Sequence, residues 1–148
     1  MILLMKQEIL ESYITYIFDF FQKSRCFKAG QGNMLRNFRF AAEKQFTRNQ
    51  LGILYFLVNT LIDNGYLYLK DRDFIALTEN GADVINGGEC VIPKISLERT
   101  IYEKETSRSD IYEQLWNIIG SNKENDYAPL YVDGPLFYNT IRPYLTTL

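Results

Sequence analysis

Positively charged side chains gather in one part of this 148-residue chain, and their chemistry suits phosphate groups. Residues 23–48 contain a single carboxylate, Glu43, among seven cations. The seven are Lys23, Arg25, Lys28, Arg36, Arg39, Lys44 and Arg48. Guanidinium and ammonium groups bind phosphate strongly, and salt limits the reach of each charge to roughly 8–10 Å. Local clustering therefore matters more for phosphate binding than the net charge of −2 on the whole chain.

Composition excludes several other kinds of chemistry. The chain has no histidine, which rules out histidine triads, histidine metal ligands and histidine proton shuttles. Its two cysteines, Cys26 and Cys90, are too few for a zinc site made of cysteine alone and do not suggest a disulfide scaffold. We therefore expect no metal and no cofactor, and we expect both thiols to be reduced and mostly buried.

The hydropathy of the sequence predicts a folded chain with no membrane-spanning segment. The chain is 47% hydrophobic and 23% charged, which suits one domain, or a small domain with an appendage. Residues 1–6 place apolar side chains before a lysine, the reverse of the order in a secretory signal. The longest uncharged run near the middle, Asn49–Ile62, is too short to cross a bilayer. We therefore expect a cytoplasmic protein with no membrane partner.

Hydrophobic periodicity predicts helices in the first half of the chain. They are expected over Lys6–Lys23, Met34–Gln45 and about Arg48–Asn64. Asn33 and Thr47 are suitable N-caps for the second and third of these helices. A brief strand is expected over Arg25–Ala29, before the turn that leads to the second helix.

A hairpin and a short helix are predicted next. Tyr66–Leu69 and Phe74–Thr78 are rich in strand-forming residues and flank a charged tip, Lys70–Asp73. Gly65 suits the left-handed position that ends the preceding helix. A short helix is expected over Ala82–Asn86.

The last third of the chain predicts a mostly helical extension. Val91–Ile95 contains a proline and is typical of a linker or edge strand. Helices are expected over Ser96–Thr106, Asp110–Ile119 and Phe137–Leu145, and a short strand over Leu130–Val132.

The order helix, strand, helix, helix, hairpin resembles that of winged helix-turn-helix domains. Leu61–Leu67 resembles this superfamily's junction between recognition helix and wing, and Leu77–Gly81 resembles the wing exit of MarR-like regulators. The resemblance covers Lys6–Gly88. It implies an α+β fold, with a winged helix of three helices and a two- or three-stranded wing sheet in residues 1–88. Residues 89–148 would be an extension that packs on this domain or makes a dimer.

The resemblance also implies which residues would meet DNA. In this superfamily the third helix usually enters the major groove, and the wing lies along the backbone or minor groove. Arg48 and Asn49 would then meet base edges, and Gly52 would permit close approach to phosphate. The remaining cations would contact phosphates: Lys28, Arg36, Arg39 and Lys44 around the second helix, and Lys70 and Arg72 at the wing tip. We therefore expect a regulatory protein of transcription that binds double-stranded DNA as a homodimer, without enzymatic activity.

Two other interpretations remain open. A winged helix can lose DNA binding and use the same surface for a protein partner, because aromatic side chains are enriched in interfaces. Three phenylalanines expected on outward helix faces favour this: Phe18, Phe40 and Phe56. An enzyme would have to use the last third of the chain, where acid–base residues surround a Gly-Pro turn. They are Tyr127, Tyr131, Asp133 and Tyr138, and the sequence places no group to activate them.

Overall fold

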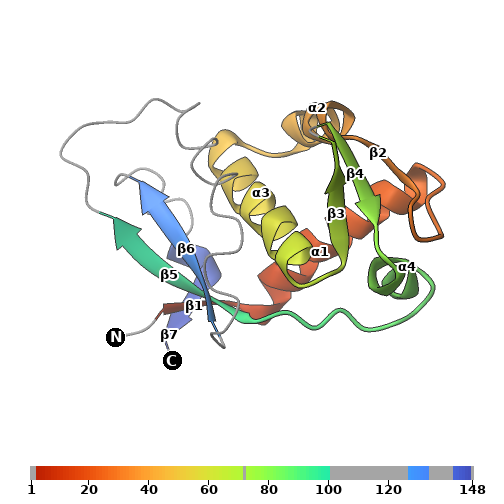
Figure 1. The fold of residues 1–148 in the computed structure, drawn as a ribbon. Helices are drawn as coiled ribbons and strands as arrows, with labels where there is room; N and C mark the ends of the chain where they lie inside the picture. Colours follow the sequence, from red (N-terminus) through yellow and green to blue (C-terminus); the bar gives the residue numbers. More distant parts are fainter. Residues whose placement is uncertain (1–2, 72, 101–126, 134–141, 148) are drawn as a thin grey trace.

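The fold is α+β (Figure 1). The other helices pack around one central helix, and one small sheet lies on each side of that helix. The structure is a computed structural model that describes residues 3–71, 73–100, 127–133 and 142–147. Its helices are α1 (Gln7–Lys23), α2 (Leu35–Gln45), α3 (Arg48–Asp63) and α4 (Glu79–Ile85), followed near the end by a 3₁₀ turn, η1 (Arg142–Tyr144). The three long helices lie where periodicity predicts them, to within one residue at each end.

The central helix α3 begins and ends at the residues that the sequence indicates. The backbone N–H of Gln50 donates to Thr47 Oγ1 (3.3 Å), and the N–H of Thr47 donates to Gln50 Oε1 (2.9 Å), which completes a capping box. At the other end Gly65 has φ +81°, a left-handed conformation that glycine adopts without steric cost. This conformation lets the Tyr66 N–H bond the Leu61 carbonyl, so the chain turns directly into the hairpin.

The predicted hairpin is confirmed, and it belongs to a three-stranded antiparallel sheet of order β2-β4-β3. Its strands are β2 (Gly32–Met34), β3 (Leu67–Lys70) and β4 (Phe74–Leu77). Thr78 Oγ1 then accepts a bond from the Gly81 N–H (3.1 Å) and caps α4. Because of this cap, α4 begins at Glu79, three residues earlier than the apolar pattern predicts.

The strand predicted over Arg25–Ala29 is wrong; the strand lies at Gly32–Met34 instead. The Gln31 side chain accepts bonds from the backbone N–H groups of Phe27 and Lys28, which holds residues 24–31 in a turn. A Cβ atom at position 32 would lie 2.0 Å from the Ile75 carbonyl oxygen, so only glycine fits beside β4 here. Asn33 is accordingly a strand residue rather than the N-cap of α2, which has no side-chain cap.

A second sheet, of order β6-β5-β1-β7, joins the start of the chain to its last third. Its strands are β1 (Leu3–Met5), β5 (Lys94–Thr100), β6 (Tyr127–Asp133) and β7 (Leu145–Thr147). β5 and β6 are parallel, and the other pairs are antiparallel. Figure 1 shows this sheet beside α3, opposite the hairpin sheet.

The described part of the extension is therefore not mostly helical. A strand occupies residues 96–100, where a helix is predicted, because β5 pairs with β1 and β6. Residues 142–145, the end of another predicted helix, form η1 and the start of β7. The strand predicted over Leu130–Val132 is confirmed as part of β6. The predicted helix Asp110–Ile119 lies outside the described residues.

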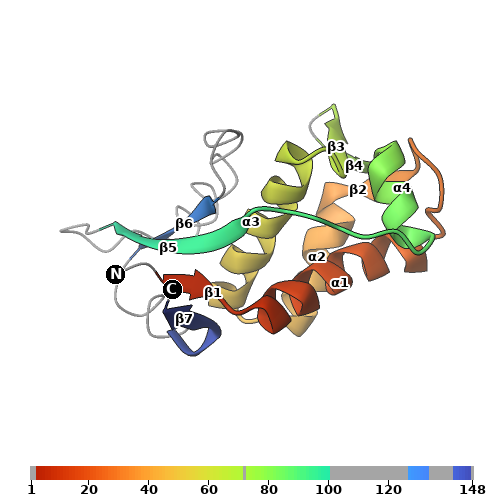
Figure 2. The ribbon, with the colours of Figure 1, turned by 90° about the horizontal axis from the view of Figure 1, so that it is seen from below.

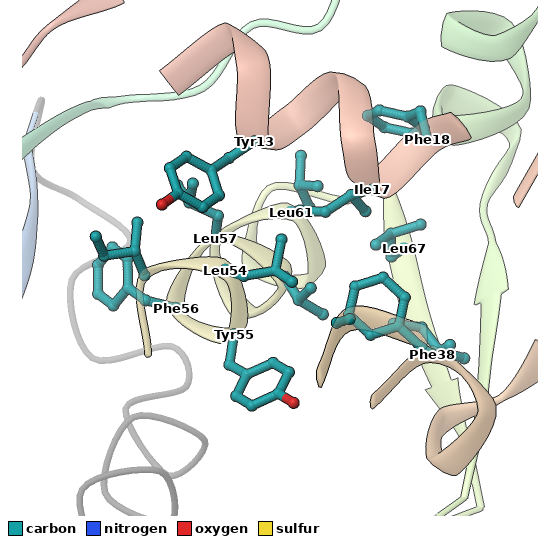
Figure 3. Packing of buried hydrophobic residues seen from close by; sticks show 14 of the residues in the cluster. Tyr13, Ile17, Phe18, Phe38, Leu54, Tyr55, Phe56, Leu57, Leu61 and Leu67 are labelled. Carbon is teal, nitrogen blue, oxygen red and sulfur yellow. The ribbon is translucent and has the colours of Figure 1, made fainter. Parts of the chain in front are cut away.

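Helix α3 is the centre of the hydrophobic core. Every residue from Leu51 to Leu61 is buried, so no side of this segment faces solvent. Figure 3 shows Phe38 of α2 and Phe56 on opposite sides of α3, with side chains of α1 and Leu67 of β3 also packed around it. A helix that is apolar all round must be covered on every side, and here α1, α2, β3 and β6 all contact it.

Candidate nucleic-acid interface

The outward face of α2 carries a group of exposed cations. Phe38 and Ala42 are fully buried and fix the side of the helix that packs on the core. Helical periodicity then turns the remaining side chains outward, and their exposure agrees. The exposed charged residues of α2 are Arg36, Arg39, Glu43 and Lys44. Three cations and one carboxylate leave this face positively charged.

Two of these cations lie over aromatic rings. The Lys44 ammonium lies 4.3 Å from the ring centre of Phe40, whose side chain is 63% exposed. The Arg39 guanidinium lies 5.9 Å from the ring centre of Tyr55, which is buried in α3. Burial raises the pKa of the Tyr55 phenol, and Arg39 acts against this shift. Cation–π contacts hold both charged groups on the exposed surface of α2 without neutralising them.

The hairpin tip lies beside the first turn of α2. Lys70, Phe74 and Met34 form one row across the three strands, because Lys70 pairs with Phe74 and Phe74 with Met34. The Leu35 N–H donates to the Asp73 carbonyl, which ties the start of α2 to the tip. With strands about 4.8 Å apart, the backbones of Lys70 and Met34 are roughly 10 Å apart. Lys70 is exposed at this tip, and Arg36 is exposed in the first turn of α2.

The rest of the tip is negatively charged among the residues that the structure describes. Asp71 and Asp73 are both exposed, and Arg72 lies outside the described residues. Lys28 is exposed but lies at the opposite end of the same sheet. Two residues after it in the loop, the Gly30 N–H donates to the carbonyl of Leu77, the last residue of β4. The structure thus places the hairpin tip, with Lys70, beside the first turn of α2, which carries Arg36. Arg39 and Lys44 follow further along the same helix, and Lys28 lies at the other end of the sheet.

The middle of α3 does not supply the open surface that the resemblance implies. Gly52 is buried, so it cannot approach a phosphate. Phe56 is also buried, with 3% of its surface exposed, and β6 of the second sheet contacts α3. Exposure remains at the two ends of the helix: Arg48 is exposed, and Asn49, Gln50, Ile62 and Asp63 are partly exposed.

The C-terminal segment also reaches the first turn of α3. Gln50 Nε2 donates to Tyr144 Oη (3.1 Å), and the Lys6 N–H donates to the Tyr144 carbonyl (2.7 Å). Burial and the neighbouring Tyr144 raise the pKa of Tyr13, which lies against this junction. The Gln50–Tyr144 bond joins residues 94 positions apart, and no local pattern in the sequence signals it.

Of the three phenylalanines expected to face outward, only Phe40 does. Phe18 is buried, at 6% exposure, on α1, which α4 contacts. Phe56 is buried as described above. A protein-binding surface built on all three rings is therefore excluded, and Phe40 alone remains available.

The two cysteines are free thiols. Cys26 is buried and Cys90 is half-buried, and burial raises the pKa of both, that of Cys90 to about 11.

Within the described residues, no three His, Cys, Asp or Glu side chains come together in a way that would hold a metal ion. The same part of the chain includes no helix with the length and hydropathy to cross a membrane. Of the acid–base candidates, Tyr138 lies outside the described residues and the other three belong to β6.

Comparison of the whole chain with protein-family models, with curated proteins and with solved structures finds no match.

Proposed function

We propose that residues 6–88 form a winged-helix domain and that this domain binds double-stranded DNA through its phosphates. The order α1, β2, α2, α3, β3, β4 supports the fold, together with a hairpin that begins directly after α3. The proposed contact surface consists of Arg36, Arg39 and Lys44 on α2 with Lys70 at the hairpin tip. Such a domain would act as a regulatory DNA-binding protein, and a homodimer would place two of these surfaces on one duplex.

The single observation that carries the proposal is the exposed, basic face of α2 beside the hairpin tip. In winged-helix proteins the helix before the recognition helix lies across the phosphate backbone, and the wing lies next to it. Side chains at those two places in this chain are the exposed cations of α2 and Lys70. Phosphate contacts supply most of the affinity in non-specific binding, so this surface is sufficient for binding without base contacts.

The buried middle of α3 limits how the sequence of DNA can be read. Base edges in the major groove are normally read by several side chains along the recognition helix. In the described structure Leu51–Leu61 are buried, and in the first turn Arg48 is exposed and Asn49 is partly exposed. We therefore expect binding that discriminates weakly between DNA sequences.

A fluorescence anisotropy titration with a labelled duplex at several salt concentrations tests the proposal. Four phosphate contacts predict a slope of log K against log salt of roughly −3.6. The double variant Arg36→Gln/Lys44→Gln should reduce this slope by roughly 2. Lys28→Gln is the control, because it removes a cation at the opposite end of the sheet and should leave the slope unchanged. Absence of binding at low salt, or an equal loss in the control, rejects DNA binding.

A second candidate function is favoured by Phe40, which is 63% exposed in the middle of the same face. Aromatic side chains are enriched in protein-binding surfaces and among their most important residues. In that case Phe40→Ala should abolish partner binding or self-association. Its effect on DNA affinity should be within about twofold, because the substitution removes no charge and an exposed side chain contributes little to the stability of the fold. Sedimentation velocity of the wild-type chain and the variant distinguishes the two functions.

A further inference from the structure

A groove lies between α1 and the segment that returns from α4 to β5, on a different side of the molecule from α2. Figure 2 shows that residues 86–94, which connect α4 to β5, run alongside α1. The groove has a volume of about 640 Å³, within the range of roughly 300–1,000 Å³ that small-molecule sites occupy. It is therefore large enough for a ligand of ordinary size.

The floor of the groove is apolar. On α1 it consists of Leu10, Ile14 and Phe18, which recur every four residues and so form one row along the helix. The opposite wall contributes Ile85 of α4 and Ile92 of the returning segment. These side chains also pack on the core, so the floor is fixed by the fold.

The returning segment is held in place at one point. Tyr66 Oη accepts a hydrogen bond from the Val91 N–H (2.9 Å) and donates one to the Val91 carbonyl (3.1 Å). Val91 lies between Cys90 and Ile92, which both line the groove. These two hydrogen bonds tie the returning segment to the junction between α3 and β3, so this wall of the groove has a fixed position in the fold.

The rim of the groove is acidic, and its charges are not evenly spread. Among the described residues that line it, three carboxylates, Glu11, Asp19 and Glu89, stand against one ammonium, Lys94. The segment runs antiparallel to α1, since Ser96 pairs with Leu4 just before the helix begins. Lys94 thus lies near the first turn of α1. Asp19 and Glu89, one from each wall, lie at the far end.

We propose that this groove binds an elongated amphipathic cation, with its apolar body on the Leu10–Ile14–Phe18 row and its positive head between Asp19 and Glu89. The apolar floor accounts for the body of the ligand, and the paired carboxylates for its charge. A ligand with a negative head would meet two carboxylates at the same place. The site is separate from the α2 surface, so the inference does not depend on DNA binding.

The test uses two probes with the same ten-carbon chain and opposite head charges, decyltrimethylammonium and decanoate, both below the concentration at which micelles form. Isothermal titration calorimetry on the full chain should show a dissociation constant for the cation that is about tenfold lower than for the anion, because one head is attracted and the other repelled at the rim. Equal or tighter binding of decanoate overturns the proposal.

Two variants locate the binding. Asp19→Asn/Glu89→Gln should weaken binding of decyltrimethylammonium about fivefold, the size expected of two exposed ion pairs. Glu43→Gln/Asp71→Asn makes the same change in net charge outside the groove and should have no effect. Thermal melts followed by circular dichroism verify that both variants fold. Equal weakening by both pairs, or by neither, contradicts the proposed position of the head group.

Cys90 provides a second readout that does not depend on heat of binding, because its half-buried thiol lines the groove. Decyltrimethylammonium should slow the modification of Cys90 by N-ethylmaleimide, measured on the peptide by mass spectrometry, in proportion to occupancy. An unchanged rate at saturating probe would mean that the ligand lies elsewhere. Self-association of the chain that disappears in Asp19→Asn/Glu89→Gln would instead assign the groove to a second copy, and would overturn the small-molecule site.

Discussion

The phenol oxygen of Tyr66 satisfies both backbone hydrogen-bonding groups of Val91, 25 residues further along the chain. Tyr66 stands where α3 turns into the hairpin, and Val91 stands in the segment that leads to β5. One side chain therefore links the hairpin sheet to the path of the chain toward the second sheet.

Replacing Tyr66 by phenylalanine removes both of these hydrogen bonds and little else. We expect Tyr66→Phe to lower the free energy of unfolding by about 1 kcal/mol, since the two bonds are close to solvent and water replaces part of them. Urea denaturation measures the change. Tyr68→Phe, at an exposed neighbouring position, is the control and should be neutral; equal stability of wild type and Tyr66→Phe would show that the link contributes nothing.

The capping box at the start of α3 should contribute measurably to stability. Thr47→Ala removes the acceptor for the Gln50 N–H and should destabilise the protein by about 1 kcal/mol, within the usual range for N-caps. Thr47→Ser keeps the hydroxyl and should retain most of the wild-type stability. Chemical denaturation of the three proteins checks this, and similar losses in both variants would point to the Thr47 methyl group instead.

Two phenylalanines on α2 should behave in opposite ways. Phe38 is fully buried, so Phe38→Ala should cost about 3–5 kcal/mol through lost burial and the cavity left behind. Phe40 is exposed on the opposite face, so Phe40→Ala should change stability by no more than about 0.5 kcal/mol. Denaturant midpoints of the two variants provide the comparison. A large loss in Phe40→Ala would mean that its face is covered in solution.

Alkaline pH should weaken the fold in part through Cys90. Burial raises the pKa of this thiol from 9.0 to about 11, so the folded state favours the protonated form. The resulting stabilisation is complete below pH 9.0, the pKa of the unfolded chain, and is lost as the pH rises through about 11. The free energy of unfolding of Cys90→Ala should therefore decline less steeply between these two pH values than that of the wild type. Parallel profiles would contradict this role for Cys90.

The sequence by itself determines the elements that depend on neighbouring residues. The apolar rows of α1, α2 and α3 repeat at the helical period, and Thr47 and Gly65 mark the two ends of α3 with side-chain and backbone chemistry that acts locally. The hairpin follows for the same reason, because its two strands are joined by a tip of three residues. The exposed cations of α2 are also predictable, since burial of Phe38 and Ala42 fixes their direction.

Only the tertiary structure decides which of these surfaces remains open. Whether α1 and α3 keep an outward face depends on α4 and on β6, which reach these helices from distant parts of the chain. The second sheet is likewise invisible to local pattern, because β1 pairs with strands that lie about ninety and more residues away. Local periodicity tells which side of a helix is apolar, whereas covering the other side requires segments brought together by the whole fold. For this reason the basic face of α2 is predictable, and the burial of α3 is not.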